Sequence, residues 1–310
     1  MTMDIRIGTR GSKLALTQSE WVKEQLERRH SGIRVDLVKI KTTGDKILDV
    51  PLSKVGGKGL FVKEIEEALL ENRVDVAVHS MKDVPAQLPD DLMLSTFPPR
   101  EDPSDALISG EQQRLDQLPK GARIGTSSLR RGAQLLHFRP DLTIVSLRGN
   151  VDTRLGKLKS GDLQAIILAA AGLNRLGLSN LITQTIPFHQ LLPAVGQGAL
   201  GLEVRRVDQK TIGLLDFLNH EDTRTTVAAE RAFLKTLEGG CQVPIAGFAQ
   251  VSGDTLSFEG LVAELDGSKI FKENETGNRD QAEEMGIRVA KKLLTSGGGD
   301  VLKRLYEGRV

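Results

Sequence analysis

Short apolar runs alternate with longer segments whose apolar residues recur every three or four positions over the first two thirds of the chain. The short runs predict buried strands, and the periodic segments predict amphipathic helices. Strands that alternate with helices are typical of α/β units built on a mostly parallel sheet. The pattern therefore predicts an α/β fold before composition or charge is considered.

The first hundred residues are expected to form one such domain. Strands are predicted at 5–8, 33–40 and 74–78, with helices at 14–29 and around Ile65. In open α/β sheets, ligands bind at the carboxyl ends of the strands. The residues that directly follow these strands are therefore candidate site residues.

A glycine-rich polar segment, residues 41–59, interrupts this series. Its glycines, aspartates and lysines are typical of a long flexible loop, which either covers a site as a lid or lies on the surface as an ordinary connection. Composition leaves both interpretations open.

Two segments rich in proline or glycine, 98–103 and 192–198, are predicted to cross between domains and to serve as hinges. A second series of strands and helices lies between them, at 123–125, 126–138, 143–147, 151–159, 165–168 and 169–176. Because there are two crossings, the chain is expected to return to its first domain.

The composition changes after residue 222. A helix to Leu237, a hairpin around Gly253, a strand near Ile270 and a helix at 280–295 are predicted. The predicted fold is α/β: two doubly wound, hinged α/β domains resembling two-lobed binding proteins, plus a small α+β C-terminal domain. The expected domains are 1–99 with 200–218, 104–193, and 222–310.

Composition narrows the class of protein. The longest apolar run, 165–173, is about half of the ~20 residues that cross a bilayer. The net charge is +1 and aromatic residues make up 4%, which argues against nucleic-acid binding. The single cysteine cannot form an internal disulfide, and no export signal is visible. We therefore expect a cytoplasmic protein without membrane or nucleic-acid partners.

Arginines recur just after predicted strands or in the first turns of predicted helices. A helix N-terminus attracts anions, and a guanidinium group adds bidentate binding of carboxylate or phosphate. Any one such arginine is usually a surface charge or an ion pair, but their recurrence favours an anion-binding cleft. The arginines in question are Arg10, Arg130, Arg131, Arg148, Arg154 and Arg175.

Three other residues are candidates for chemistry. Asp83 follows a buried strand, where it is either a cap or surface partner or a cleft carboxylate. His79 is more typical of a packed histidine than of a base. Cys241 follows two glycines in a turn before Pro244, and is either a buried thiol or a nucleophile. Metal-ligand spacings, a phosphate-binding loop and a serine-hydrolase elbow are absent from the sequence.

Seven ordered motifs resemble the porphobilinogen deaminase, or hydroxymethylbilane synthase, family over nearly the whole chain. Departures are minor: Gly11 and Lys13 flank Ser12 where relatives vary, and 110–114 carries no recognisable motif. The motifs are Val55-Gly56-Gly57-Lys58-Gly59-Leu60-Phe61, His79-Ser80-Met81-Lys82-Asp83-Val84-Pro85, Arg100-Glu101-Asp102-Pro103, Gly125-Thr126-Ser127-Ser128-Leu129-Arg130-Arg131, Leu147-Arg148-Gly149-Asn150, Pro193-Ala194-Val195-Gly196-Gln197-Gly198 and Glu238-Gly239-Gly240-Cys241-Gln242-Val243-Pro244.

The resemblance implies a transferase of tetrapyrrole biosynthesis, the route to porphyrins and heme. Family members join four porphobilinogen molecules head to tail with loss of ammonia, then release hydroxymethylbilane by hydrolysis. The growing chain is held on a dipyrromethane cofactor, which is linked by a thioether to the cysteine that matches Cys241. The resemblance also implies a monomer.

It further implies roles for individual residues. Asp83 would hold pyrrole N–H groups and stabilise the positive charge that develops when ammonia leaves. Phe61 would either stack on a cofactor ring or pack in the core. The implied cofactor-binding residues are Cys241, Lys82, Asp83, Ser127, Ser128, Arg130, Arg131 and Arg148, and the implied substrate-binding residues are Arg10, Ser12, Arg154, Arg175 and Gln197.

Two alternatives from other classes have sequence features in their favour. Hinged α/β lobes with arginines at strand ends also suit a non-catalytic anion-binding protein, although that class has no use for Cys241 in its turn. A cysteine hydrolase would use the thiol, but no histidine is evidently placed as its base.

Overall fold

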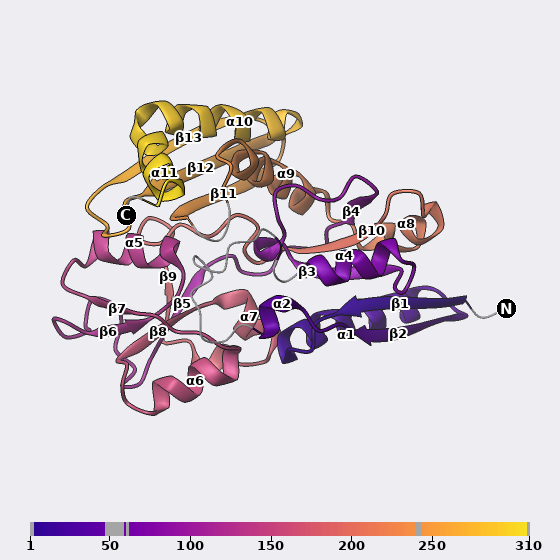
Figure 1. Cartoon of the computed structure of the whole chain (residues 1–310), viewed down its shortest axis with the longest axis horizontal. Coiled ribbons are helices and arrows are strands. Elements are labelled where there is room, and N and C mark those ends of the chain that lie inside the picture. Colours follow the sequence, from indigo (N-terminus) through magenta and orange to yellow (C-terminus); the bar gives the residue numbers. More distant parts are fainter. Residues whose placement is uncertain (1–2, 47–58, 60–61, 240–242, 309–310) are drawn as a thin grey trace. The chain divides into compact units, whose positions relative to one another are not determined.

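The computed structural model describes residues 3–46, 59, 62–239 and 243–308. The chain divides into two compact units, Met1–Glu101 with Ala199–Arg224, and Asp102–Gly198 with Thr225–Val310 (Figure 1). Of the three points at which the chain passes between the units, 101/102 and 198/199 fall within or beside the two predicted crossings, and 224/225 lies close to the predicted start of the C-terminal domain at 222. Among the described residues, no helix has the length and apolar character needed to span a membrane.

The first unit is built on a five-stranded sheet with the order β2-β1-β3-β10-β4. β1 runs parallel to β2 and β3, whereas β10 is antiparallel to β3 and β4. Its elements are β1 (Met3–Thr9), α1 (Lys13–Arg29), β2 (Ile33–Lys39), α2 (Thr43–Lys46), α4 (Lys63–Leu70), β3 (Val76–Ser80), the 3₁₀ turn η1 (Met81–Asp83), β4 (Leu92–Thr96), β10 (Leu200–Arg205), α8 (Gln209–Leu215) and the 3₁₀ turn η3 (Asp216–Leu218).

Helices cover both faces of this sheet, as the doubly wound prediction requires. Val22 and Leu26 of α1 pack with Ile7 of β1 in one fully buried cluster. Ile65 of α4 packs with Ala77 of β3 in another. The α/β prediction for this unit is confirmed.

The second unit contains another five-stranded sheet, with the order β7-β6-β8-β5-β9. β6 runs parallel to β7 and β8, and β5 is antiparallel to β8 and β9. The elements are β5 (Asp105–Ser109), β6 (Arg123–Gly125), α5 (Leu129–Phe138), β7 (Thr143–Val145), α6 (Val151–Lys159), β8 (Ala165–Ala169), α7 (Ala170–Arg175), the 3₁₀ turn η2 (Ser179–Leu181) and β9 (Gln184–Ile186).

Both sheets are more mixed than the strand pattern predicted, because strands that follow a crossing run antiparallel to their neighbours. β10 shows the cause: its first residue, Leu200, pairs with Ser80 at the end of β3. The chain therefore enters the sheet at its carboxyl edge and must run the other way. Sequence analysis did not predict β4, β5, β9 or β10.

The C-terminal part of the second unit is a three-stranded antiparallel sheet with the order β11-β12-β13, as the hairpin pattern predicted. Phe233 of α9 and Phe258 of β12 are fully buried, with ring centroids 5.0 Å apart. The turn residue Gly253 has φ +59°, a conformation that favours glycine. The elements are α9 (Glu221–Thr236), β11 (Ile245–Ser252), β12 (Thr255–Ala263), β13 (Ile270–Asn278), the 3₁₀ turn η4 (Arg279–Gln281), α10 (Ala282–Leu293), the π-helical turn η5 (Leu294–Gly298) and α11 (Gly299–Tyr306).

Candidate active site

The carboxyl edge of the first sheet carries the predicted site residues of the first unit. β1 and β3 are parallel neighbours, with Ile7 opposite Val76, so both strands end at the same edge. Arg10 and Ser12 follow β1, and the Ser12 hydroxyl caps α1 by accepting a hydrogen bond from the backbone N–H of Ala15 at 3.3 Å. Lys82 and Asp83 follow β3 in the turn η1.

The turn that carries Asp83 is fixed by backbone hydrogen bonds. The N–H of Met81 donates to the carbonyl of Ala199 at 3.0 Å, and the N–H of Val84 donates to the carbonyl of Met81 at 3.2 Å. Asp83 itself is half-buried. Within the described part of the chain its carboxylate makes no hydrogen bond or ion pair.

The carboxyl edge of the second sheet gathers most of the predicted arginines. β6, β7 and β8 are parallel and end together, and β5 begins at the same edge because Asp105 pairs with Ala169. The residues after these strand ends include Ser127, Ser128, Arg130, Arg131, Arg148, Arg154 and Arg175.

Hydroxyl groups and backbone carbonyls order this edge locally. The Ser128 side chain caps α5 by accepting from the backbone N–H of Arg131 at 3.4 Å. Ser127 Oγ donates to the carbonyl of Leu147 at 2.9 Å and lies 3.0 Å from Ser146 Oγ. Arg154 Nε donates to the carbonyl of Gly149 at 2.8 Å. The start of α5 is thus hydrogen-bonded to the segment that follows β7.

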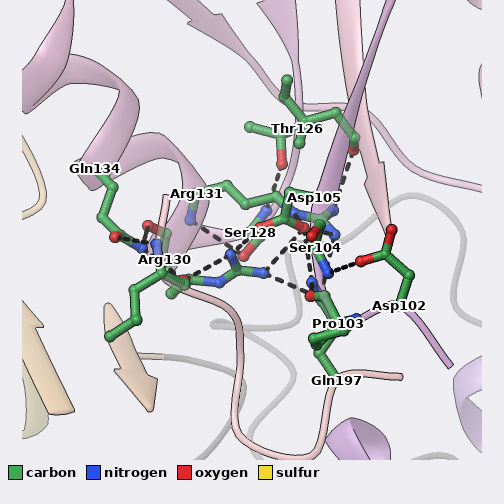
Figure 2. A network of polar contacts seen from close by, with 12 residues as sticks. Asp102, Pro103, Ser104, Asp105, Thr126, Ser128, Arg130, Arg131, Gln134 and Gln197 are labelled. Atoms are coloured by element: carbon green, nitrogen blue, oxygen red, sulfur yellow. Dashed lines mark hydrogen bonds and ion pairs between the residues drawn. The ribbon is translucent and has the colours of Figure 1, made fainter. Parts of the chain in front are cut away.

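Arg130 and Arg131 form ion pairs with the buried carboxylate of Asp105 (Figure 2). Asp105 was not among the site residues predicted from the sequence. Arg131 Nε is 2.8 Å from Asp105 Oδ1, and Arg130 forms an ion pair with Asp105 Oδ2. All three side chains are at most 7% exposed. Further donors of the two guanidinium groups reach the backbone carbonyls of Ile167 and Leu192, each at 3.1 Å.

The electrostatics of this cluster favour an ionised carboxylate. Burial alone would raise the pKa of Asp105, but the charges and hydrogen bonds of Arg130 and Arg131 outweigh it and lower that pKa to about 2. Two guanidinium groups and one carboxylate leave a net buried charge of one positive unit. That residual charge lies at the N-terminus of α5, where anions are already favoured.

Gln197 joins the two crossings within the second unit. Its Nε2 donates to the carbonyl of Pro103 at 2.6 Å and to Asp105 Oδ1 at 3.0 Å, and its Oε1 accepts from Arg130 Nη2 at 3.2 Å (Figure 2). Arg175 Nη2 donates to the carbonyl of Gly198 at 2.7 Å. The chain entering the unit and the chain leaving it are therefore tied to one cluster.

Some predicted features lie outside the described residues: Cys241, Phe61 and most of the predicted lid, 41–59. Within that loop, the structure describes the short helix α2 and Gly59, whose φ of +86° favours glycine. Among the described residues, no group of three or more histidine, cysteine, aspartate and glutamate side chains is arranged to hold a metal ion.

Comparison with models of known protein families identifies the family of this chain. Residues 5–213 match the model described as porphobilinogen deaminase, dipyromethane cofactor binding domain, and residues 224–295 match that of the porphobilinogen deaminase C-terminal domain. The chain belongs to the porphobilinogen deaminase family. The family predicted from the seven motifs is confirmed.

Relatives named porphobilinogen deaminase match over nearly their full length. The protein from Syntrophotalea carbinolica is 58% identical and aligns over 97% of this chain and 96% of its own. Those from Geobacter sulfurreducens and Trichlorobacter lovleyi are each 56% identical over 99% of this chain, with 96% and 98% of their own lengths covered.

Solved structures similar to this chain include solute-binding proteins. A TRAP periplasmic solute-binding protein from Desulfovibrio salexigens has a TM-score of 0.44 at 13% identity, covering 72% of this chain and 74% of its own. The methionine-binding protein MetQ has a TM-score of 0.44 at 14% identity, covering 68% and 88%. At these scores the likeness carries no functional argument.

Proposed function

We propose that Asp83, Cys241 and the arginines at the two sheet edges carry out the reaction of this transferase. The porphobilinogen deaminase family joins four porphobilinogen molecules, releases ammonia at each step and frees hydroxymethylbilane by hydrolysis. Family membership over 97–99% of the chain carries this assignment. The roles of individual residues are the proposal, and the sheet-edge placement of the described ones supports it.

Asp83 is proposed to stabilise the positive charge that forms on a pyrrole nitrogen. Loss of ammonia from porphobilinogen leaves a methylene carbon conjugated with a cationic pyrrole nitrogen, and a carboxylate within hydrogen-bond reach of that N–H lowers the barrier. A new carbon–carbon bond then forms at the methylene carbon, and the proton released at the junction balances the proton taken up by ammonia. The half-buried position of Asp83 in the turn after β3 supports such a role.

Donors at the second sheet edge fit a cofactor that carries carboxylates. Pyrrole acetate and propionate groups accept hydrogen bonds, and this edge offers hydroxyl and guanidinium donors. The dipyrromethane supplies, when bound, the free ring position to which the first substrate is joined. We propose that Cys241 holds it through a thioether, with Ser127, Ser128, Lys82 and Arg148 among its ligands.

The arginines are proposed to have two different roles, direct binding of carboxylates and a longer-range electrostatic contribution. Arg10, Arg148, Arg154 and Arg175 are half-buried and would bind cofactor or substrate carboxylates directly, with Ser12 as a further donor. Arg130 and Arg131 are buried against Asp105 and would contribute the residual positive charge of their cluster. Gln197 would act through that cluster.

The three-domain division predicted from the sequence, with 98–103 and 192–198 as hinges, remains part of the proposal. The hydrogen bond between Gln197 and Pro103 supports the pairing of the two hinges, because it joins one hinge segment to the other. We further propose that the enzyme is a cytoplasmic monomer. Gel filtration with light scattering tests its mass.

Replacement of the proposed anchor tests the attachment of the cofactor. We expect Cys241→Ser to carry no covalent pyrrole, because the hydroxyl does not replace the thiolate nucleophile that forms the thioether. Intact-mass measurement of the denatured protein reads this directly, and colour with an aldehyde reagent confirms it. The wild-type protein is the control. A full-mass adduct on Cys241→Ser would assign the attachment to another residue.

Replacement of one edge arginine tests the carboxylate clamp. We expect Arg148→Ala to slow chain elongation by about 10- to 100-fold, the range for loss of a charge-assisted hydrogen bond of about 1.5–3 kcal/mol. Unfolding should change little because Arg148 is half-buried. Single-turnover assays with porphobilinogen, analysed for bound intermediates by mass, measure elongation. Arg114→Ala, at an exposed arginine of the same unit, is the control. Normal elongation in Arg148→Ala would remove this residue from the clamp.

A further inference from the structure

A buried histidine–glutamate pair lies behind the turn that carries Asp83. His79 Nε2 is 2.8 Å from Glu203 Oε2, and their side chains are 4% and 0% exposed. His79 belongs to β3, two residues before η1, and Glu203 belongs to β10. An ionised carboxylate only accepts hydrogen bonds, so with Glu203 in that form the imidazole donates from Nε2.

The register of the two strands explains how the pair forms. His79 is directly opposite Gly201, and Glu203 is directly opposite Ala77. Paired residues of antiparallel strands share a face, and diagonal neighbours are within reach of long side chains. The two small residues occupy one diagonal, so His79 and Glu203 can meet along the other.

The next residue on this face joins the turn to the same strand. Met81 is 2% exposed, and a Cβ on Gly201 would collide with its Sδ. The Met81 N–H is hydrogen-bonded to Ala199 as well. The passage from β3 into η1 is thus held to β10 by a hydrogen-bonded pair, a side-chain contact and a backbone hydrogen bond in succession.

Charged groups around the pair come from the elements packed on this face. Helix α4, which lies beside β3 (Figure 1), brings Glu66 and the exposed Glu67, and β10 also brings Arg205. Burial, with the nearby charge of Glu203, raises the pKa of Glu66 to about 7. Arg205 is bound to Asp75, Asp208 and the carbonyls of Leu69 and Val74. Among the described residues, His79 is the side-chain hydrogen-bond partner of Glu203.

We propose that His79 and Glu203 are positioning residues, whose buried bond holds the end of β3 so that Asp83 presents its carboxylate in the working geometry. Breaking a buried hydrogen bond leaves unsatisfied polar groups and is costly, so the pair favours one arrangement of the two strands. Catalysis depends steeply on the position of charged groups, because a displacement of about 1 Å can lower a rate by about 100-fold. The inference rests on the proposed role of Asp83.

Two substitutions at position 203 separate positioning from folding. Glu203→Gln keeps the shape and a hydrogen-bond acceptor but loses the charge, and Glu203→Leu loses both. We expect kcat, measured per mole of folded enzyme with cofactor attached, to fall by roughly 10-fold for Gln and roughly 100-fold for Leu. KM for porphobilinogen should stay within about twofold, since the pair does not touch substrate. Glu67→Gln, at an exposed residue of α4, is the control.

Combining Glu203→Gln with Asp83→Asn shows whether the effect passes through Asp83. If it does, Glu203→Gln has no further effect on the residual rate of Asp83→Asn, because the group it positions is gone. A Glu203→Gln effect that persists in that background overturns the positioning role, and so does unchanged kcat in both single variants. Normal kcat in Asp83→Asn alone instead removes the role of Asp83. Far-UV circular dichroism and intact mass, taken on each variant, define the folded, cofactor-loaded fraction.

Discussion

Asp83→Asn is expected to lower kcat by about 100- to 1000-fold, the range found when one group that stabilises developing charge is removed. Asparagine has nearly the same size and still accepts a hydrogen bond, so the fold and the bound cofactor should be retained. What is lost is the negative charge opposite the cationic pyrrole nitrogen. Steady-state assays of porphobilinogen consumption measure the effect.

The control for this experiment is a second aspartate of the same unit. Asp90 is exposed in the turn before β4, and Asp90→Asn should keep kcat within about twofold, as expected for a surface substitution. Intact mass establishes that both variants carry the full cofactor. A near-normal kcat in cofactor-loaded Asp83→Asn would exclude the electrostatic role.

Asp105→Asn is expected to destabilise the second unit by about 3–5 kcal/mol, because it leaves two buried guanidinium groups without their counter-charge. It also weakens the acceptor that Gln197 and both arginines share. Urea titration followed by circular dichroism measures the loss. Asp141→Asn is a matched control, since its partner Arg139 and Asp141 are 19% and 22% exposed and the ion pair is partly solvated.

The pH dependence of this effect has a definite sign. The pKa of Asp105 is lowered in the folded protein, from 3.8 to about 2, so its contribution to stability is complete above pH about 3.8 and is lost as the pH falls towards 2. The difference between wild type and Asp105→Asn should therefore be constant from pH 7 to about 4 and then narrow. If the difference in unfolding free energy between the two proteins widened on acidification, or were absent at pH 7, the proposed stabilisation by the buried ion cluster would be contradicted.

Sequence pattern predicted the helices and the strands of the parallel series well, because their apolar periodicity is local. Helix α5 is one example, since the pattern predicted it at 126–138 and it spans Leu129–Phe138. Strand β10 was missed because it forms only when the chain returns from the other unit and pairs at Ser80. Such non-local pairing leaves no periodic signal beyond a short apolar run.

The cluster of Arg130, Arg131 and Asp105 shows the same limit of sequence-based prediction, because its members come from distant parts of the chain. Arg130 and Arg131 were identified by their place at a predicted helix start, but their partner is 25 residues away in sequence for Arg130 and 26 for Arg131. Asp105 follows a proline-rich crossing and opens an apolar run, which predicts nothing about an ion pair. The position of Asp105 at the start of an apolar, buried strand could have indicated the ion pair, because a carboxylate that is buried there requires a cation.

The sequence by itself determined the family, the reaction and the identity of the candidate groups, Asp83 and Cys241 among them. It could do so because short ordered motifs preserve the residues that chemistry requires. Only the tertiary structure decided which of these groups are already satisfied by the protein. It paired Arg130 and Arg131 with Asp105, joined His79 of β3 to Glu203 of β10, and left the carboxylate of Asp83 without a partner among the described residues. Burial and charge compensation depend on contacts between distant segments, and those contacts exist only in the folded chain.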